Sequence, residues 1–243
     1  MNHNINLRNL IPSFYTLSKT KVVNGIQCEK YLYLSVHKPK YKTPPDELTV
    51  QKFKKGRSFE AIFKESFSNG IAVNEILKKD LFSQGVAFTN EIFNQNRANN
   101  LFEACFLYNK TLVMTDVCQI QEDGSYIIYE VKNSVEEKEV FIQDMAIQYY
   151  VCSHSRKGLA QFNLVLPDGN GGFKIIDKTE TLKAFIPNVE QQIIEFLKIL
   201  KQEEEPSIEM GAQCFQPYKC EFIEYCTKEN TQKANPIFKE IDF

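Results

Sequence analysis

The residues best suited to chemistry are two carboxylates and an amine, Asp116, Glu130 and Lys132. They come from two apolar runs rich in β-branched residues that flank the turn signal Glu122-Asp123-Gly124, which predicts a β-hairpin. A three-residue loop with Gly124 in the left-handed conformation sets Asp116 directly opposite Glu130, with Cβ atoms about 4.5–5.5 Å apart. Lys132 is two residues beyond Glu130 and therefore points to the same face.

Two carboxylates held this close repel each other, so they must share a proton or a cation. Mg²⁺ is commonly bound by one or two carboxylates together with the phosphate oxygens of a substrate. Beside such an ion, Lys132 could neutralise charge that develops on an attacked phosphate. The alternative is a hairpin face whose charges are simply solvated, because Asp, Glu and Lys are common surface residues.

Hydrophobic periodicity predicts the elements that must position these residues. The expected strands are Phe102–Tyr108, Leu112–Ile120, Tyr126–Val131, Leu159–Leu166 and Phe173–Ile176. The expected helices are residues 19–35 with Cys28 inside, Leu48–Phe67, Phe88–Asn99, Glu139–His154, and Thr179–Glu205 with an interruption near Pro187. Gly70–Phe82 is expected to be either a strand or a helix.

One amide interrupts an apolar helical stripe that should face the hairpin. Phe141, Met145 and Cys152 share the face of the helix Glu139–His154 on which Gln148 also lies. A buried amide in such a stripe is more often a hydrogen-bonded core residue than a catalytic one.

Asp116, Glu130-Val131-Lys132 and the later Gln148 resemble the motif of the PD-(D/E)XK nuclease superfamily, and Gln148 resembles the glutamine of its RecB-like branch. The resemblance implies an αβββαβ core with a metal-dependent phosphodiesterase site. Asp116, Glu130 and the backbone carbonyl of Val131 would hold Mg²⁺ or Mn²⁺. Lys132 would steady the nucleophile, and Gln148 would orient Lys132 or contact DNA. Thr115 stands where the family has Pro, and Cys152 stands where the branch has Tyr, which makes Tyr149 a substitute candidate.

The same resemblance suggests further metal ligands. Gly56-x3-Glu60 stands where CRISPR-associated members have Gly-x3-His, so Glu60 is expected to be a third ligand. Glu103, at the start of the first core strand, is a weaker candidate for the same cavity. Ion-paired glutamates on helices are common without any metal, which is the alternative for Glu60.

Three cysteines form a regular triplet near the end of the chain, Cys214-x5-Cys220-x5-Cys226, and a fourth, Cys28, lies far upstream. Cytoplasmic disulfides are rare, so a soft-metal site is favoured over cross-linking. Four thiolates suit either tetrahedral Zn²⁺ or an iron–sulfur cluster, and the spacing alone does not decide between them. The other three cysteines are expected in the core, as small apolar residues: Cys105, Cys118 and Cys152.

The cysteine positions are similar to those of the iron–sulfur branch of the superfamily, which includes CRISPR-associated RecB-like exonucleases and the AddB nuclease domain. They also resemble the N-terminal module of a bacterial family of long uncharacterised proteins, whose second domain has no counterpart here. The resemblance implies that Cys28, Cys214, Cys220 and Cys226 ligate a [4Fe-4S] cluster that joins the two ends of the chain.

Composition sets outer bounds. The chain has 243 residues, 43% of them hydrophobic and 25% charged, which is typical of a globular protein. We expect one nuclease domain over 1–243, with a core at 51–179 and a helical, iron–sulfur lobe at 1–50 and 180–243. Neither a long apolar run nor a signal pattern is present, so we expect a cytoplasmic protein that does not enter membranes.

Positive charge is concentrated at the start of the chain. Residues 1–60 hold 11 Lys and Arg against 4 acidic residues, although the net charge of the whole chain is −2. A basic segment could follow a phosphate backbone, and a solvated lysine-rich surface explains the same count.

Together these observations favour a Mg²⁺- or Mn²⁺-dependent deoxyribonuclease. By resemblance, its substrate is expected to be single-stranded DNA or DNA with free ends, cleaved as an exonuclease. The alternative is a nuclease-like module that binds DNA or acts as a scaffold without turnover, within a repair or defence complex.

Overall fold

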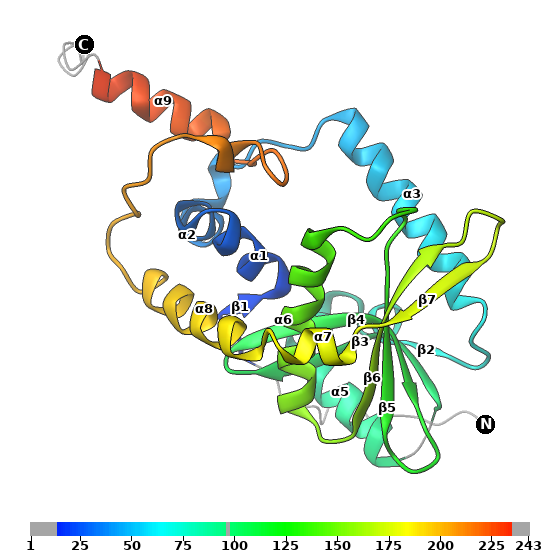
Figure 1. Ribbon diagram of the computed structural model, residues 1–243. Coiled ribbons are helices and arrows are strands. Elements are labelled where there is room, and N and C mark those ends of the chain that lie inside the picture. The colour runs from blue at the N-terminus through cyan, green and yellow to red at the C-terminus, as the bar shows by residue number, and fades with distance from the viewer. Residues whose placement is uncertain (1–13, 96–97, 235–243) are drawn as a thin grey trace.

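The computed structural model of the protein describes residues 14–95 and 98–234. The predictions that reach residues 1–13, 96–97 and 235–243 lie partly outside the described residues; they are the ends of the domain assignment and part of the helix expected at Phe88–Asn99. The fold is a mixed α/β fold, as expected, with one sheet and helices on both of its faces (Figure 1).

Seven strands of the described chain form this sheet. They are β1 (Leu17–Ser18), β2 (Ile71–Ala72), β3 (Asn100–Tyr108), β4 (Thr111–Ile120), β5 (Tyr126–Val131), β6 (Leu159–Pro167) and β7 (Phe173–Asp177). The order is β2-β3-β4-β5-β6-β7, and β1 pairs with β4 outside this path. The pairs β3–β4, β4–β5 and β6–β7 are antiparallel, whereas β1–β4, β2–β3 and β5–β6 are parallel.

The hairpin of β4 and β5 forms in the expected register. Cys118 pairs with Ile128 and Val117 with Tyr129, so the next facing residues are Asp116 and Glu130. Gly124 has φ +81°, the left-handed conformation that the three-residue loop requires. The local turn chemistry and the strand pattern therefore fix the register.

The sheet divides beyond this point. Pairing between β4 and β5 ends at Val117 and Tyr129, while β5 continues beside β6 as far as Val131. The start of β4 instead pairs with β1, through Leu17 opposite Thr111. We call the point where β5 leaves β4, at Asp116 and Glu130, the fork.

Nine α-helices and three short 3-10 helices accompany the strands in the described residues. They are α1 (Lys19–Gln27), α2 (Glu29–His37), η2 (Pro39–Tyr41), α3 (Glu47–Lys64), α4 (Val73–Leu77), η3 (Lys78–Asp80), α5 (Leu81–Gln95), α6 (Glu139–Ser155), α7 (Thr179–Lys183), α8 (Ile186–Ile199), η4 (Ala212–Cys214) and α9 (Ile223–Ala234). Along the chain, α5, β3, β4, β5, α6 and β6 follow one another as helix, three strands, helix and strand.

Two apolar clusters cover the two faces of the sheet. Helices α5 and α6 contribute to the larger cluster, where Met145 and Cys152 of α6 join Cys118 and Ile128 of the hairpin. Helix α3 covers the other face with Phe63, which joins a second cluster that includes Val117, Val131 and Val165. Because neighbouring strand residues alternate between faces, Asp116 and Glu130 belong to the α6 face.

The largest differences from the sequence predictions lie at three places. Cys28 does not lie inside a helix; its extended backbone separates α1 from α2, which allows the chain to turn there. Helix α5 begins at Leu81 rather than Phe88, and the segment before it, from Gly70, holds the short elements β2, α4 and η3. Helix α8 ends at Ile199, well before Glu205. Pro187 lies in the first turn of α8, where a missing N–H costs nothing.

No helix of the described residues is both long and apolar enough to cross a membrane.

Candidate metal and charged site

Asp116 lies at the fork and connects the two strands through its side chain. Its carboxylate Oδ2 accepts a hydrogen bond from the backbone N–H of Val131 at 2.7 Å. This bond takes the place of a backbone pairing just where the β4–β5 ladder ends. The side chain is therefore held toward β5, beside Glu130.

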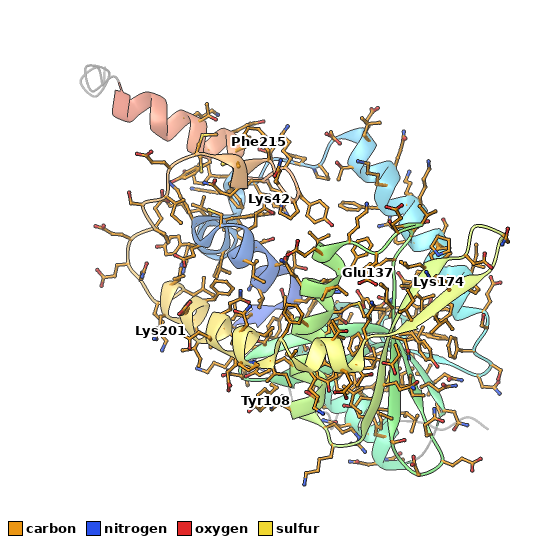
Figure 2. The ribbon with its side chains drawn as sticks, viewed as in Figure 1. Lys42, Tyr108, Glu137, Lys174, Lys201 and Phe215 are labelled. Carbon is orange, nitrogen blue, oxygen red and sulfur yellow. The ribbon has the colours of Figure 1, made fainter. Side chains whose placement is uncertain are left out.

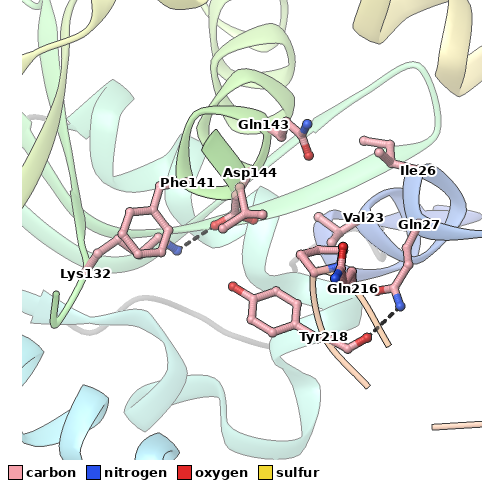
Figure 3. A pocket seen from close by; sticks show the side chains of 11 residues that line it. Val23, Ile26, Gln27, Lys132, Phe141, Gln143, Asp144, Gln216 and Tyr218 are labelled. Atoms are coloured by element: carbon pink, nitrogen blue, oxygen red, sulfur yellow. Dashed lines mark hydrogen bonds and ion pairs between the residues drawn. The ribbon is translucent and has the colours of Figure 1, made fainter. Parts of the chain in front are cut away.

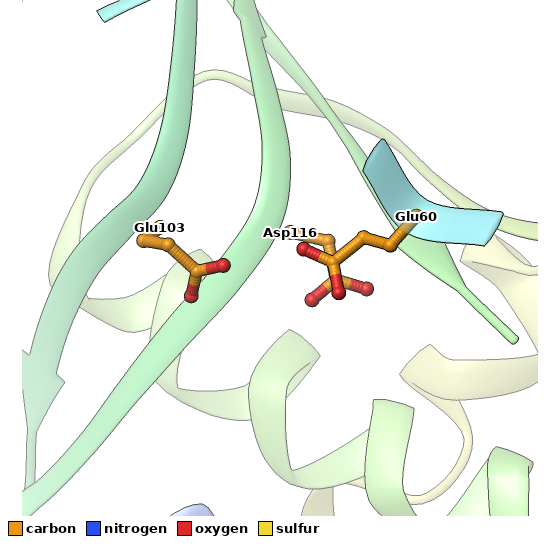
Figure 4. A group of neighbouring side chains, drawn as sticks. All are labelled: Glu60, Glu103 and Asp116. Atoms are coloured by element: carbon orange, nitrogen blue, oxygen red, sulfur yellow. The ribbon is translucent and has the colours of Figure 1, made fainter. Parts of the chain in front are cut away.

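Glu60, Glu103 and Asp116 form a carboxylate trio (Figure 4). One oxygen from each lies within 4.8 Å of the others, close enough to bind one ion. The three side chains come from α3, β3 and β4, so the trio joins a helix on one face to two strands. Oxygen donors at this spacing suit a hard divalent cation such as Mg²⁺ or Mn²⁺.

The backbone of Glu103 is unusual and explains how this residue joins the trio. Its φ is +55°, in the left-handed region that side-chain-bearing residues rarely adopt. Phe102 and Ala104 on either side pair regularly with β4, but the ladder omits Glu103. Such strain persists where the surrounding structure holds it and is typical of functional sites.

The charges of the trio are balanced only in part. Burial and the nearby Glu130 charge raise the pKa of the Asp116 carboxyl well above its usual value. Burial also raises the pKa of Glu103, and the charge of Glu60 adds to this. Lys64 opposes the repulsion by forming ion pairs with Glu60 and, at 3.0 Å, with Glu103. A positive charge in addition to Lys64 would therefore stabilise the ionised trio. A divalent metal ion could supply that charge.

A second charged group lies beside the trio on the α6 face. Lys132 Nζ lies 2.8 Å from Glu130 Oε1 and 2.6 Å from Asp144 Oδ2. Lys19 Nζ lies 3.0 Å from the same Glu130 oxygen and 3.3 Å from the same Asp144 oxygen. We call these four residues the charged quartet: Lys19, Glu130, Lys132 and Asp144.

Within the quartet, neighbouring opposite charges counteract the effect of burial on the pKa of Glu130 and of Lys132. Burial alone would raise the pKa of Glu130, but Lys132 and Lys19 outweigh it and hold that pKa well below its usual range. Burial likewise would lower the pKa of Lys132, and the Glu130 and Asp144 carboxylates raise it instead. The neighbouring carboxylates thus favour the charged ammonium form of Lys132, which lies close enough to Asp116 to act on its pKa.

Gln148 approaches the quartet from α6 and is completely buried. Its side chain helps to lower the pKa of Glu130, so the amide lies close to that carboxylate. Neither polar atom of the Gln148 side chain, however, has a hydrogen-bond partner within the described residues, and the same holds for Glu130 Oε2. Buried polar atoms rarely remain unpaired, so an orphaned carboxylate oxygen at this place suits a ligand that the chain does not itself supply.

The predicted site residues are distributed over these two groups. Asp116, Glu60 and Glu103 form the trio, while Glu130 and Lys132 belong to the quartet and Gln148 lies against it. Val131 contributes its N–H to Asp116. Tyr149 turns elsewhere: its ring lies 6.1 Å from that of Phe162, centroid to centroid, within the core.

Three charged residues of the site escaped sequence reasoning: Lys19, Lys64 and Asp144. Asp144 precedes Gln148 by four residues, so helical spacing already places it on the same face. Lys64 follows Glu60 by four residues and is accessible to the same reasoning. Lys19 carried no such signal, because it reaches Glu130 through the pairing of the two-residue strand β1 with β4.

The four cysteines expected to bind a cluster line one small cavity between α2 and α9. Cys28, Cys214, Cys220 and Cys226 share its walls with residues such as Tyr31 and Phe222. Burial raises the pKa of the Cys220 thiol to about 11, and the three other thiols lie near enough to add to this effect. No disulfide is present among the seven cysteines, all of which belong to the described chain. Cys105, Cys118 and Cys152 are buried in the core as expected.

The cysteines are gathered without forming a closed metal site. Among the described residues, the carboxylate trio meets the 4.8 Å spacing for three ligand atoms, and the cysteine sulfurs do not. Two sulfurs on one zinc ion are at most about 4.6 Å apart, because each Zn–S bond is about 2.3 Å. The observed arrangement is therefore wider than a tetrahedral zinc site.

Comparisons with known proteins place the chain in no family. No family model matches it, and no curated protein does. Sixteen chains of solved structures match, and one, "Crystal structure of SSO0001", aligns with a TM-score of 0.37 and 12% sequence identity over 83% of each chain. A similarity of this size assigns neither a family nor an activity.

Proposed function

We propose that this protein is a divalent-metal-dependent phosphodiesterase that cleaves DNA. The observation that carries the proposal is the carboxylate trio at the fork, with the Lys132 ammonium and the orphaned Glu130 Oε2 beside it. Oxygen ligands, a neighbouring ammonium and a partly unbalanced negative charge are the groups that metal-assisted phosphate hydrolysis requires.

Each residue has a distinct role in this proposal. Asp116 is the central ligand, with Glu60, Glu103, Glu130 and the Val131 carbonyl as the remaining candidate donors. When bound, Mg²⁺ or Mn²⁺ would lower the pKa of a coordinated water and polarise the phosphate.

Lys132 stabilises negative charge on the phosphate through its ammonium group. Asp144 and Glu130 hold that ammonium in place through ion pairs. Lys19 pairs with the same two carboxylates and balances the second negative charge. Gln148 packs under the group and supplies an amide that can orient either Lys132 or the substrate.

The preference for single-stranded DNA with free ends rests on the resemblance to RecB-like exonucleases. The resemblance also supports a [4Fe-4S] cluster at Cys28, Cys214, Cys220 and Cys226, and their shared cavity agrees with it. Four thiols in one cavity are the donors that either an iron–sulfur cluster or a zinc ion uses, and the resemblance favours the cluster. Such a cluster would hold α1 and α2 to the C-terminal loop and offset the entropy of closing that loop.

The direct test is cleavage of labelled single-stranded DNA with Mn²⁺ by the wild type and by Lys132→Ala. We expect the wild type to cleave and the variant to lose about 100-fold or more in rate, as for removal of other transition-state donors. Lys174→Ala is the control, because Lys174 lies on β7, outside both charged groups (Figure 2). Equal cleavage by the wild type and Lys132→Ala would rule out this site as the source of activity.

One observation favours a second candidate, a nuclease-like module that binds DNA or a protein partner of a repair or defence complex without turnover. All four residues of the quartet are joined by four ion pairs, and such a network can have a purely structural role. This candidate would be supported if the wild type and the variant both bind DNA and neither cleaves it with Mg²⁺ or Mn²⁺.

A further inference from the structure

A second cavity opens next to the charged quartet. It measures about 440 Å³ and lies between α1, α6 and the loop that connects Cys214 to Cys220 (Figure 3). This volume is within the range of about 300–1,000 Å³ that small-molecule sites occupy. Lys132 and Asp144 form one wall, so the cavity is continuous with the proposed catalytic groups.

The remaining walls combine aromatic rings with side-chain amides. Phe141 is buried on the α6 side, with the Lys132 ammonium 5.8 Å from its ring centre. Tyr218, which is 57% exposed, extends from the loop on the opposite side. Gln143 and Gln216 also line the cavity, and each carries a side-chain amide.

The loop that carries Tyr218 is fixed to α1. Gln27 Nε2 donates to the backbone carbonyl oxygens of Gln213 at 2.8 Å and Tyr218 at 2.7 Å. These bonds hold the loop against α1, so the cavity has defined walls on both sides. A site of this kind is largely formed before its ligand arrives.

We propose that this cavity binds the base and sugar of the nucleotide whose phosphate lies at Lys132, an inference that rests on the proposed phosphodiesterase function. Aromatic rings stack on bases of any sequence. Amides present both donors and acceptors, which match the edges of an unpaired base. The ammonium group of Lys132 holds the adjoining phosphate at the mouth of the cavity.

The occupant must be a single strand or an unpaired end. A base enclosed between α1, α6 and the loop cannot at the same time be stacked and paired in a duplex. The geometry therefore assigns the strand preference of the enzyme to this cavity, which the trio and the quartet alone do not explain.

Tyr218→Ala tests the proposal, with Phe215→Ala as the matched control. Both aromatic residues are exposed on the same loop, Phe215 at 59%, but only Tyr218 lines the cavity. Fluorescence anisotropy measures the binding of a fluorescein-labelled eight-nucleotide dT strand in the presence of Ca²⁺. This binding measurement does not depend on cleavage. Hydrolysis with Mn²⁺ of a labelled strand of eight abasic tetrahydrofuran phosphates, which carries no aromatic group to stack in the cavity, reports the catalytic site separately.

We expect Tyr218→Ala to bind the strand at least about fivefold more weakly, which corresponds to the loss of one stacking contact. Its hydrolysis of the base-free substrate should stay within about twofold of wild type, and Phe215→Ala should change neither measurement. Equal strand binding by Tyr218→Ala and Phe215→Ala would overturn the assignment, as would a parallel loss on the base-free substrate. A wild type that binds the strand but hydrolyses neither substrate would instead contradict the proposed function and leave the binding comparison to decide on the cavity.

Discussion

The carboxylate of Asp116 accepts a hydrogen bond from the backbone N–H of Val131, 2.7 Å away on the neighbouring strand. The bond occurs where backbone pairing between β4 and β5 stops, so a side chain completes what the ladder leaves open. It also fixes the position of an acid whose pKa is raised by burial and by the charge of Glu130. Ionised Asp116 is therefore held in place at a cost in free energy, which a bound cation can offset.

Asp116→Asn should stabilise the metal-free protein while abolishing cleavage. Because the pKa of Asp116 is raised in the folded state, folding favours its protonated form, and stability falls as pH rises from its unfolded pKa through its folded pKa. The amide removes this loss and can still accept the Val131 hydrogen bond. We expect the variant to gain about 1 kcal/mol, or about 2–4 °C in Tm, at pH 8 in EDTA.

Two controls accompany this experiment. The gain should disappear near pH 4, where wild-type Asp116 is protonated, and saturating Mn²⁺ should raise the Tm of the wild type more than that of the variant. A variant that is less stable than the wild type at pH 8 in EDTA would show that Asp116 is not repelled by its neighbours.

Lys19→Met should lower both stability and activity. The substitution leaves Glu130 and Asp144 with Lys132 as their remaining partner, and unpairing buried charges is costly; we expect a loss of about 2 kcal/mol. The pKa of Glu130 should rise toward its usual value, so the acidic limb of the pH–rate profile should shift to higher pH.

Lys21→Met is the matched control for Lys19→Met. Lys21 lies on the same helix, and its ammonium donates to the backbone carbonyl of Thr16 at 3.2 Å. We expect it to change stability by at most about 0.5 kcal/mol, with no shift in the pH profile. Identical pH profiles for wild type and Lys19→Met would exclude a positioning role for Lys19.

The purified protein should contain iron and acid-labile sulfide, and Cys220→Ser should lose both. Loss of the cluster should lower the Tm by several degrees, because the metal–thiolate bonds would no longer join Cys28 to the C-terminal loop. Cys152→Ala, a change in the α6 core stripe, should keep the iron content of the wild type. Anaerobic purification followed by metal analysis decides the matter, and a colourless protein with one equivalent of zinc would refute the cluster.

Two glycines in helices should respond to alanine in opposite ways. A Cβ atom at Gly25 would lie 2.8 Å from two ring atoms of Phe196, a buried core residue, so Gly25→Ala should destabilise by about 1–3 kcal/mol. At Gly56 of α3 a Cβ atom meets nothing within 4 Å, and Gly56→Ala should stabilise by about 0.5–1 kcal/mol. Urea unfolding of both variants measures the difference, and equal signs would contradict the packing of α1 on α8.

The hairpin could be predicted because its information is local. The residues Glu122 to Gly124 define the turn, and alternation in the flanking runs defines which side chains share a face. The position of Asp116 opposite Glu130 follows from those two facts, and so does Lys132. The spacing of α6 placed Gln148 on the same side and would also have placed Asp144.

The positions of the remaining site residues depend on tertiary contacts that a periodic sequence pattern does not predict. Lys19 reaches Glu130 because a strand of two residues, Leu17–Ser18, pairs with β4, and so short a strand has no alternating pattern. Glu103 joins the trio because its backbone adopts φ +55°, against the preference of a glutamate. Hydrophobic periodicity predicted Cys28 inside one helix, but Cys28 lies between the end of α1 and the start of α2.

Hydrogen bonds between residues far apart in the sequence determine the order in which the two candidate sites can form during synthesis. The bond of Lys19 to Glu130 can form only after a residue 111 positions later has been synthesised, and the bond of Gln27 to Tyr218 only after one 191 positions later. A chain still emerging from the ribosome can therefore pair its hairpin early, but its charged quartet forms only after residue Asp144 has appeared. The 440 Å³ cavity also needs the loop from Cys214 to Cys220, so its walls are complete only after Tyr218 has been synthesised.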